Sequence, residues 1–469
     1  MSEKKSSLDI AGTPPDHGVG DSEAIMYDKE AENDFEVFKK TTDGVDFRTV
    51  GWVKATVIFL KVIFATGVLS IPTAMYSLGA VGGALSVIGW GALNTYTAVI
   101  QGNFRNNHAH CHSIADMAEH VGGVVAREIT GFLFIVAYVL CSGSGIIGVA
   151  TGLNALSEHA ACTNWWAFIA TVVVCMAAAV RKFEKVAWLT WAGFLSIFIA
   201  VFIVVIAVTT RDRPAAAPQT GPYELGYHAI AYPTFVAGMT ASATIFVSSA
   251  GTSAFLPVIS EMRNPKDFKK ALYVCMSLVT AAYLSFSLVV YRWCGAWVAS
   301  PSLGSAGPTV KKVAYGIGLV GLIVSACLYL HVASKYVFVR VLRNSRHLQS
   351  NTLVHWGTWL GTVLCLGSLS FILAQSIPIF NYLIALTGTV CFAPLAISLP
   401  GWLWLYDYGS WRTGTLAQKG AYWFHWFLVV LGVFFLAGGT YGVVQEIIDA
   451  YASGLIGSAF SCADNSGST

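Results

Sequence analysis

Eleven long apolar segments make up most of this chain, and they limit its fold more than any other feature of the sequence. A helix needs about 20 apolar residues to cross the hydrocarbon core of a bilayer, and ten of the segments have more than 20. The segments are Trp52–Ser77, Ala80–Gly102, Glu128–Gly152, Trp165–Val180, Val186–Thr209, Ala231–Leu256, Leu272–Trp293, Val313–Ser334, Leu353–Leu373, Gln375–Leu399 and Tyr422–Glu446. The sequence therefore predicts an all-α polytopic membrane protein with 11 transmembrane helices.

The charge content supports a membrane location. Charged residues are 11% of the chain and hydrophobic residues 55%, whereas an ordinary soluble domain has about 25% charged residues. Nineteen of the charged side chains lie before residue 55, which leaves few for the rest of the chain. A soluble enzyme, a nucleic-acid-binding protein and a disordered protein do not fit this balance, because each would expose a large apolar surface to water. The lipid bilayer is the expected partner.

The chain is expected to divide into a tail, a membrane domain and a second tail. Residues 1–50 are acidic, contain Pro14-Pro15 and have few aliphatic side chains, as is typical of a disordered segment. They do not resemble a cleavable signal peptide, because the first apolar run begins only near Trp52. We therefore predict a disordered cytoplasmic tail over 1–50, a transmembrane domain over 51–446 and an extracytoplasmic tail over 447–469.

The distribution of lysine and arginine predicts the orientation in the membrane. With the N-terminal tail inside and 11 crossings, 22 basic residues fall in cytoplasmic segments and five fall outside. The Trp165–Val180 segment is the shortest, and omitting it would reverse the side of every later loop. This orientation places the C-terminus outside, together with Cys162, Cys294 and Cys462, where a disulfide can persist. The sequence does not decide which of these cysteines would pair.

No pattern in the sequence is typical of a metal centre or an enzyme active site. There is no Cys-x-x-Cys pair, and His108, His110, Cys111 and His112 are too close together to form a tetrahedral site. No nucleophile with its base and no carboxylate pair occurs at matching depth in the predicted helices. We therefore expect no metal, no cofactor and no catalytic residues, and we do not expect an enzyme.

Two of the predicted helices are interrupted near their middles. The first contains Thr66-Gly67 before Pro72, and the sixth contains Ala250-Gly251 before Pro257. Since helix 1 would run outward and helix 6 inward, the two breaks are related by inversion. Unwound backbone in a bilayer persists only where it lines a polar site, and paired interrupted helices indicate the binding site of a transporter. Kinks or close helix packing are the alternative interpretation, which the matching positions of the two breaks make less favourable.

Three motifs give the chain a resemblance to a known family. They are Thr66-Gly67-Val68-Leu69-Ser70-Ile71-Pro72, the helix 6 exit Ile259-Ser260-Glu261-Met262-Arg263-Asn264-Pro265-Lys266-Asp267-Phe268, and Ser376-Ile377-Pro378-Ile379-Phe380 before Leu386-Thr387-Gly388. With these motifs the chain resembles the amino acid/auxin permease family, in particular its fungal neutral amino acid permeases, from about Phe47 to Glu446. The resemblance implies the fold of the bacterial leucine transporter, with helices 1–5 and 6–10 as inverted repeats and helix 11 appended. Many relatives have a larger side chain where this chain has Ser248-Ser249-Ala250, so the size of the substrate stays open.

The two breaks offer complementary partial charges for the two ends of a zwitterion. Amides at the start of the outer half of helix 1 direct positive charge toward a carboxylate, and carbonyls freed in helix 6 can accept from an ammonium. Neither break contains Asp or Glu, which favours amino acids over simple amines. Gly67 is expected to let the backbone approach the substrate in a conformation that is costly for other residues. The expected substrate-binding residues are Ala65, Thr66, Gly67, Val68, Ser248, Ser249, Ala250, Gly251 and Thr252.

Side chains from other helices would complete the pocket if the resemblance to the family holds. Tyr138 lies near the middle of helix 3 and could hydrogen-bond the substrate, although a membrane tyrosine is more often a packing residue. Ser325, in the middle of helix 8, is a second candidate.

Lys61 is the least expected residue of the predicted membrane helices. It lies about one and a half turns before the break in helix 1, where a charge is costly and usually functional or paired. Glu261, at the inner end of helix 6, is a candidate partner, and the two could form an inner gate. The alternative is that Lys61 extends to the inner headgroups and that Glu261 anchors the turn at Asn264-Pro265.

The expected function is secondary active transport of neutral L-amino acids, with alternating access around the breaks in helices 1 and 6. Lys61, Glu261 and His331 are the candidate titratable groups, and they do not decide the coupling ion. The resemblance to fungal permeases implies proton symport. An uncoupled facilitator and a membrane amino acid sensor that uses the same pocket are the alternatives. A vacuolar membrane would suit the same helices, but we expect the plasma membrane.

Overall fold

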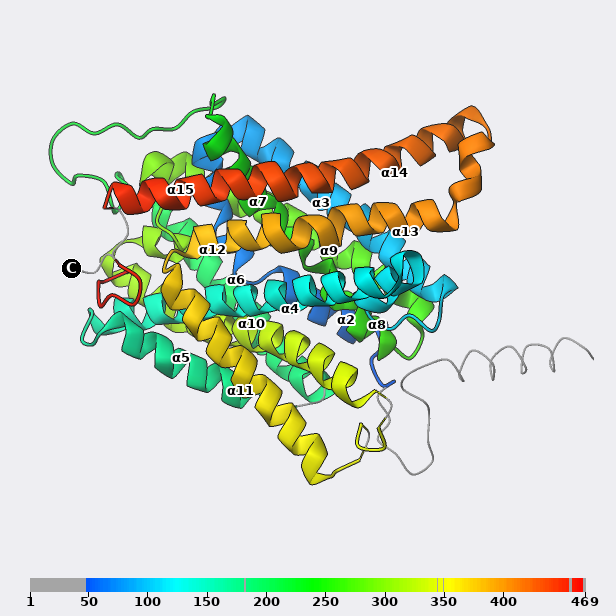
Figure 1. Ribbon diagram of the computed structural model, residues 1–469. Helices are drawn as coiled ribbons and strands as arrows, with labels where there is room; N and C mark the ends of the chain where they lie inside the picture. Colours follow the sequence, from blue (N-terminus) through cyan, green and yellow to red (C-terminus); the bar gives the residue numbers. More distant parts are fainter. Residues whose placement is uncertain (1–47, 181–182, 344, 349, 455–457, 467–469) are drawn as a thin grey trace, which may run out of the picture.

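The computed structural model describes residues 48–180, 183–343, 345–348, 350–454 and 458–466, which form a helical bundle (Figure 1). Almost all of the predicted tail over 1–50 therefore lies outside the described residues. The α-helices are α2 (Trp52–Ile63), α3 (Ile71–Asn107), α4 (Ile114–Ser157), α5 (Thr163–Ala178), α6 (Phe183–Thr209), α7 (Phe235–Ala250), α8 (Phe255–Ser260), α9 (Phe268–Cys294), α10 (Pro308–Leu342), α11 (Leu353–Ser376), α12 (Phe380–Thr387), α13 (Leu399–Asp407), α14 (Leu416–Phe434) and α15 (Thr440–Ala452). The all-helical fold predicted from the sequence is confirmed.

The number of helices that can cross a bilayer is close to the predicted one. Nine helical stretches of the described chain are long and apolar enough to do so. A tenth results if Phe380–Phe392 and Pro394–Asp407, which are bent by 42° relative to each other, count as one span. With 16 residues, α5 is shorter than these spans. The count of 11 stays a prediction that depends on α5.

The outer half of predicted helix 1 and predicted helix 2 are both part of α3. Gly79, with a φ of 75°, is the non-helical residue between them. A Cβ atom on Gly79 would lie 2.7 Å from the backbone nitrogen of Ala231. Both the left-handed conformation and this close contact therefore require glycine.

Helix starts follow sequence signals that satisfy free backbone amides. Ser113 and Asp116 form a capping box at the start of α4, in which the Asp116 amide donates to Ser113 Oγ at 3.2 Å. Thr415 and Gln418 form a second capping box at the start of α14. Pro308 begins α10, where its missing N–H removes no helical hydrogen bond.

The helices pack in two groups that share the centre of the bundle. One group has α10 packed against α4 and α6, and the other has α3 packed against α7 and α9. α14 and α15 run along one side of the bundle (Figure 1), where α15 packs against α7. Trp423 and Phe427 of α14 are exposed, as expected for side chains in contact with lipid.

The described chain begins and finishes at opposite ends of the bundle. It begins at the end where α14 starts, and its last segment lies at the end where α15 finishes (Figure 1). We call these the inner end and the outer end, because the excess of basic residues predicts that the first faces the cytoplasm. Termini at opposite ends fit an odd number of crossings.

Candidate functional site

The predicted break in helix 1 is present in the structure. α2 finishes at Ile63, and Phe64 leaves the helical conformation with a ψ of 73°. A single 3₁₀ turn over Gly67–Leu69 follows before α3 begins at Ile71. Among the described residues, the backbone amides of Thr66, Gly67 and Val68 donate no hydrogen bond. These amides lie at the position that the sequence predicts for binding a carboxylate.

The break in helix 6 is tighter than the break in helix 1. α7 finishes at Ala250, a 3₁₀ turn covers Gly251–Ala254, and α8 begins at Phe255. The backbone stays close to helical conformations through this turn, so the change lies mainly in the hydrogen-bonding pattern. Helix 6 therefore has an interruption at the predicted place, but no extended stretch.

The two breaks lie against each other. Ser248 Oγ donates to the carbonyl of Gly67 at 3.2 Å, and a Cβ atom on Gly67 would lie 2.8 Å from Cα and Cβ of Ser248. Gly67 is not among the glycines with positive φ, so the expectation of a backbone conformation costly for other residues is wrong. Glycine is required here because the two backbones approach so closely.

Three buried tyrosines donate hydrogen bonds to carbonyls at the breaks, one of which, Ile63 O, also accepts from the Ala65 amide at 2.8 Å. Tyr283 of α9 donates to Ile63 O at 2.6 Å and to Ser248 O at 3.0 Å. Tyr329 of α10 donates to Val62 O at 3.0 Å. An unsatisfied carbonyl at this depth would be costly, and these hydroxyl groups supply the missing donors. Tyr283 and Tyr329 were not predicted as site residues. The sequence feature that could have indicated them is a hydroxyl group inside an apolar segment.

Tyr138 is the third tyrosine, and the structure gives it a backbone partner. Its hydroxyl donates to Gly251 O at 3.1 Å and lies 3.0 Å from Ser253 Oγ. Tyr138 is fully buried and does not line the cavity between the breaks. Its predicted hydrogen bond to a substrate is untested, but in this structure it stabilises the helix 6 break.

A small cavity lies between the two breaks, beside the contact of Gly67 with Ser248. Its volume is about 30 Å³, which is close to the share of one water molecule in the liquid. No charged side chain from the described part of the chain lines it, and four of the predicted binding residues do: Thr66, Gly67, Ser248 and Gly251. The rest of the lining is Val62, Ile63, Cys141, Ser144, Val247, Tyr329, Ile384, Thr387 and Phe392.

The other predicted binding residues surround this cavity without lining it. Ala65, Val68 and Ala250 are fully buried. Ser249 accepts from Asn94 Nδ2 of α3 at 2.8 Å, so it contributes to helix packing. Thr252 is also buried, and its hydroxyl has no hydrogen-bond partner among the described residues.

Lys61 is fully buried, so the interpretation that it extends to the headgroups is wrong. Its Nζ donates to Ser325 Oγ at 2.7 Å and to Gly321 O at 3.1 Å. A Cβ atom on Gly193 of α6 would lie 3.0 Å from Lys61 Cε, so this glycine leaves room for the side chain. Ser325 is therefore a partner of Lys61 and not a lining residue of the cavity.

The predicted Lys61–Glu261 pair is not formed. Glu261 forms a buried ion pair with Lys335 of α10 instead. The sequence prediction ended helix 8 at Ser334 and placed Lys335 in a cytoplasmic loop, whereas α10 continues to Leu342 and buries Lys335. The helix is about two turns longer than predicted. Because this places Lys335 inside the protein, the partner of Glu261 was assigned incorrectly.

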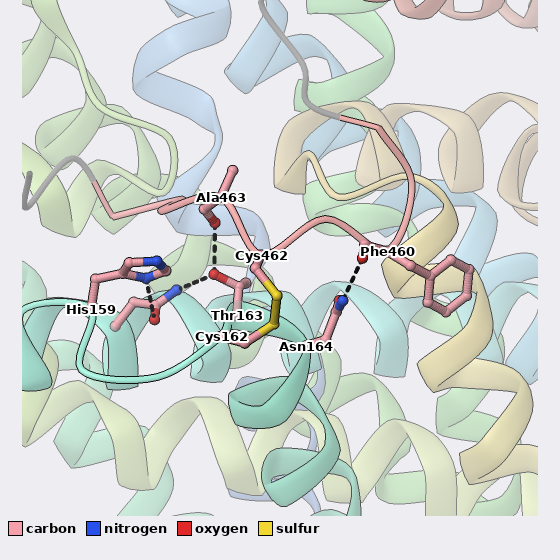
Figure 2. Close-up of a disulfide and its surroundings, with 8 residues drawn as sticks. His159, Cys162, Thr163, Asn164, Phe460, Cys462 and Ala463 are labelled. Atoms are coloured by element: carbon pink, nitrogen blue, oxygen red, sulfur yellow. Dashed lines mark hydrogen bonds between the residues drawn. A yellow bond between two sulfur atoms is a disulfide. The ribbon is translucent and has the colours of Figure 1, made fainter.

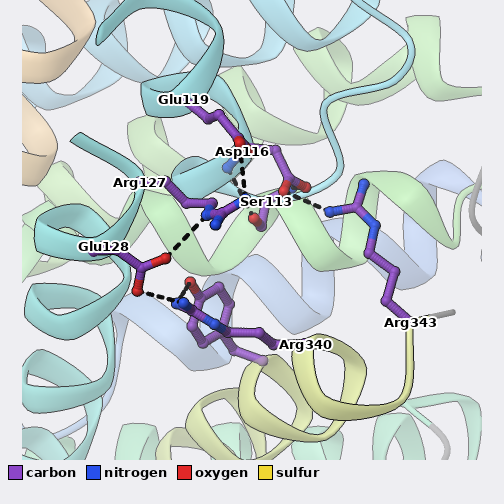
Figure 3. A network of polar contacts seen from close by, with 8 residues as sticks. Ser113, Asp116, Glu119, Arg127, Glu128, Arg340 and Arg343 are labelled. Carbon is purple, nitrogen blue, oxygen red and sulfur yellow. Dashed lines mark hydrogen bonds and ion pairs between the residues drawn. The ribbon is translucent and has the colours of Figure 1, made fainter. Parts of the chain in front are cut away.

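The Glu261–Lys335 pair lies at a polar cavity of about 300 Å³ at the inner end. Ser253 of the helix 6 break, Ser260 and Lys335 are among its lining residues. Ion pairs connect the first part of α4 with the end of α10 across this region (Figure 3). Arg343 with Asp116 and Arg340 with Glu128 connect the two helices, and Arg127 pairs with Glu119 and Glu128 within α4.

The histidines between α3 and α4 make contacts of their own. His108 Nε2 lies 2.8 Å from an Asp407 carboxylate oxygen, and His110 Nε2 lies 3.2 Å from His120 Nδ1. In the part of the chain that the structure describes, no group of three or more His, Cys, Asp or Glu side chains could hold a metal ion. Buried His331 packs edge-on against Trp359, away from the breaks.

The comparison with protein families identifies this arrangement. The family described as "Transmembrane amino acid transporter protein" matches residues 48–445. The chain belongs to this family of amino acid transporters. It is therefore an integral, multi-pass membrane protein and an amino acid transporter, as the sequence motifs indicated.

Individual relatives and solved structures agree with this assignment. The chain is 51% identical to a "Transmembrane transporter" of Gibberella moniliformis, over 97% of this chain and 95% of that protein. It is 27% identical to the "N amino acid transport system protein" of Neurospora crassa, over 89% of each. MhsT, in a crystal structure with L-phenylalanine, is 12% identical, with a TM-score of 0.52 over 85% of this chain and 98% of that one. The fold of the transporter is therefore that of the bacterial leucine transporter group.

Proposed function

We propose that the protein is a secondary active transporter that moves neutral L-amino acids by proton symport. The observation that carries the substrate is the cavity between the breaks. Thr66 and Gly67, whose backbone amides donate no hydrogen bond among the described residues, line its helix 1 side, and no charged side chain of the described residues lines it. The amides would bind the substrate carboxylate, and the uncharged walls suit a neutral side chain.

The small volume of this cavity supports alternating access. About 30 Å³ is too little space for an amino acid, so the helices that line this cavity must move apart for the substrate to enter. Movement of helices 1 and 6 away from α4 and α10 would also release the carbonyls of Val62 and Gly251 from the hydroxyls of Tyr329 and Tyr138. These carbonyls would then be able to accept hydrogen bonds from the substrate ammonium.

Lys61 is the proposed proton-binding group. Its partners, Ser325 Oγ and Gly321 O, are both uncharged, so burial of the ammonium is not compensated by a carboxylate. A buried charge without an ion partner is costly, and loss of the proton removes this cost. Because Lys61 connects α2 to α10, protonation would hold the inner half of helix 1 in place, and deprotonation would loosen it.

Uptake into reconstituted vesicles tests both parts of the proposal. Labelled neutral, acidic and basic amino acids are supplied with and without an inward proton gradient, and exchange at equal concentrations is measured in parallel. We expect the gradient to drive accumulation of neutral amino acids alone. Equal uptake with and without the proton gradient would indicate a facilitator, and binding without flux would indicate a sensor.

The variant Lys61→Met tests the proton site separately. We expect it to retain exchange of neutral amino acids but to lose accumulation driven by the proton gradient. Lys54→Met is the matched control, because Lys54 is an exposed lysine on the same helix. Normal gradient-driven accumulation by Lys61→Met would exclude Lys61 as the proton-binding group. We place the transporter in the plasma membrane, which detection of a surface-labelled protein on intact cells would check.

A further inference from the structure

The chain after α15 returns across the outer end of the bundle and is covalently fixed there (Figure 2). Cys462 forms a disulfide with Cys162, the N-cap residue of α5, across a sequence separation of 300 residues. We call residues 458–466 the outer strap. The third cysteine that was expected at this end, Cys294, is buried and free.

Hydrogen bonds on both sides of the disulfide attach the outer strap to the ends of three helices, α4, α5 and α10. Side chains of these helices donate to oxygen atoms of the strap. The bonds are Asn154 Nδ2 to Asn465 Oδ1 (2.9 Å), Thr163 Oγ1 to Ala463 O (2.7 Å), Asn164 Nδ2 to Phe460 O (2.6 Å) and Lys311 Nζ to Ser466 O (3.0 Å). The strap therefore connects helices that are far apart in sequence.

The strap also holds the turn between α11 and α12. The Phe460 amide donates to the carbonyl of Gln375 at 3.1 Å, and the Phe460 ring packs edge-on against Phe371. From the last turns of α15, the Tyr451 hydroxyl donates to Ser376 O at 3.1 Å. The residues just before α12 are thus fixed to the same helix ends as the disulfide.

The helix that follows this turn contacts the outer half of helix 1. Asn381 Nδ2, in the first turn of α12, donates to Thr73 Oγ1 at 2.7 Å. Further along α12, Ile384 and Thr387 line the cavity between the breaks. A chain of contacts therefore leads from the disulfide, through the α11–α12 turn, to the outer side of the candidate site.

We propose that the outer strap is a tether that keeps α12 against the outer half of helix 1 and so restrains opening of the site toward the outside. The proposal rests on alternating access as the proposed function. The strap fixes the α11–α12 turn to α4 and α5, and any outward movement of α12 must stretch these contacts. Opening the disulfide leaves the hydrogen bonds and the packing of Phe460 as the restraint from the strap. The site should then open outward more often.

Native Cys141 provides a reporter for this movement, because it is a free cysteine that lines the cavity. A membrane-impermeant maleimide is added to intact cells, and its rate of reaction at Cys141 is read by peptide mass spectrometry. The full-length protein is compared with Cys462→Ser and with Cys294→Ser, the control that removes a thiol outside the strap. The parent is also measured after treatment with a phosphine, which takes oxygen from water and leaves two thiols at Cys162 and Cys462.

We expect labelling of Cys141 to become about fivefold faster or more in Cys462→Ser and in the reduced parent. Cys294→Ser should label at the parent rate. Reduction acts on protein that is already folded, so it decides the question even if Cys462→Ser folds poorly. An unchanged rate in the parent after mass spectrometry has confirmed the loss of the disulfide would overturn the proposal.

The labelling result does not depend on which substrate is carried. If the vesicles show no uptake of neutral amino acids but reduction still accelerates labelling, the proposed function fails and the tether stands. If uptake is normal and the rate of Cys141 labelling does not change after reduction of the disulfide, the tether fails and the function stands. Cys462→Ser has no disulfide to open. If the phosphine accelerated labelling of Cys141 in this variant, the result would also count against the tether.

Discussion

Glu261→Gln should loosen the inner end of the transporter, because it leaves the Lys335 ammonium buried beside an uncharged side chain. The Lys335 side chain is 9% exposed and the Glu261 side chain 3%, so the two form a buried ion pair. Removing one partner of such a pair costs about 3–5 kcal/mol. The pair connects the inner end of helix 6 to α10, and the segment before helix 1 joins it through a hydrogen bond from the Val50 amide to Glu261 O at 3.0 Å.

The effect on transport depends on how much of this free energy stabilises the closed inner end relative to the open one. If the inner end opens by separating Glu261 from Lys335, a loss of about 3 kcal/mol shifts the closed–open equilibrium by about 150-fold. We therefore expect Glu261→Gln to lower the thermal stability and to favour the inward-open state. In vesicles, net uptake should fall while the affinity measured from the inner side rises.

A double-mutant cycle with Glu261→Gln, Lys335→Met and the double variant provides the test. Each single change should be more harmful than the double, because a single change keeps one charge of the ion pair buried while removing the opposite charge, and the double removes both. Glu158→Gln is the control at the outer end, where the ammonium of Lys312 holds the pKa of the exposed Glu158 carboxyl below its usual value. An exposed pair contributes little to stability. Single-variant effects that add within about 0.5 kcal/mol would refute the inner-gate role of the pair.

Three further predictions concern residues at the breaks. Gly67→Val should abolish uptake while expression continues, because its side chain would collide with Ser248 at 2.8 Å; transport at the parent rate would mean that this contact is not required. Tyr283→Phe should lower the free energy of unfolding by about 1–3 kcal/mol, since the buried Ser248 and Ile63 carbonyls both lose this hydroxyl as a donor, although Ile63 O keeps the Ala65 amide, and an unchanged thermal midpoint would contradict this. Lys61→Ala and Glu261→Ala should have effects on uptake that add within about 0.5 kcal/mol, because the two side chains have different partners, and a strong coupling would restore the pair suggested by the sequence.

The sequence predicted the features that depend on the local composition of the chain. Apolar segments of sufficient length predicted the membrane helices, and Gly67 and Gly251 with the prolines that follow them predicted where two helices are interrupted. Both interruptions are present. The motifs around them predicted the family, which the match over 48–445 confirms. These predictions succeeded because a helix and its breaks are determined largely by residues within a few turns.

Partners that come from distant parts of the chain could not be predicted in the same way. The hydrogen bond between Lys61 and Ser325 spans 264 positions, and the Glu261–Lys335 pair spans 74. The Glu261–Lys335 pair was missed because the eighth helix was predicted to end at Ser334. The next residue, Lys335, is buried in the structure. Periodicity and composition predict how deep a residue lies, but the choice of partner depends on how the helices are rotated against one another.

The three tyrosines at the breaks belong to different parts of the bundle, and this division suggests how the site can open. Tyr283 is on α9, which packs against α2, and it donates to both breaks at once. Tyr138 and Tyr329 are on α4 and α10, which pack extensively against each other. If helices 1 and 6 move with α9 relative to α4 and α10, the hydrogen bond of Tyr283 is retained, while those of Tyr138 and Tyr329 break. The carbonyls of Gly251 and Val62 are then the ones released for a substrate ammonium, and the tie between the two breaks persists throughout the cycle.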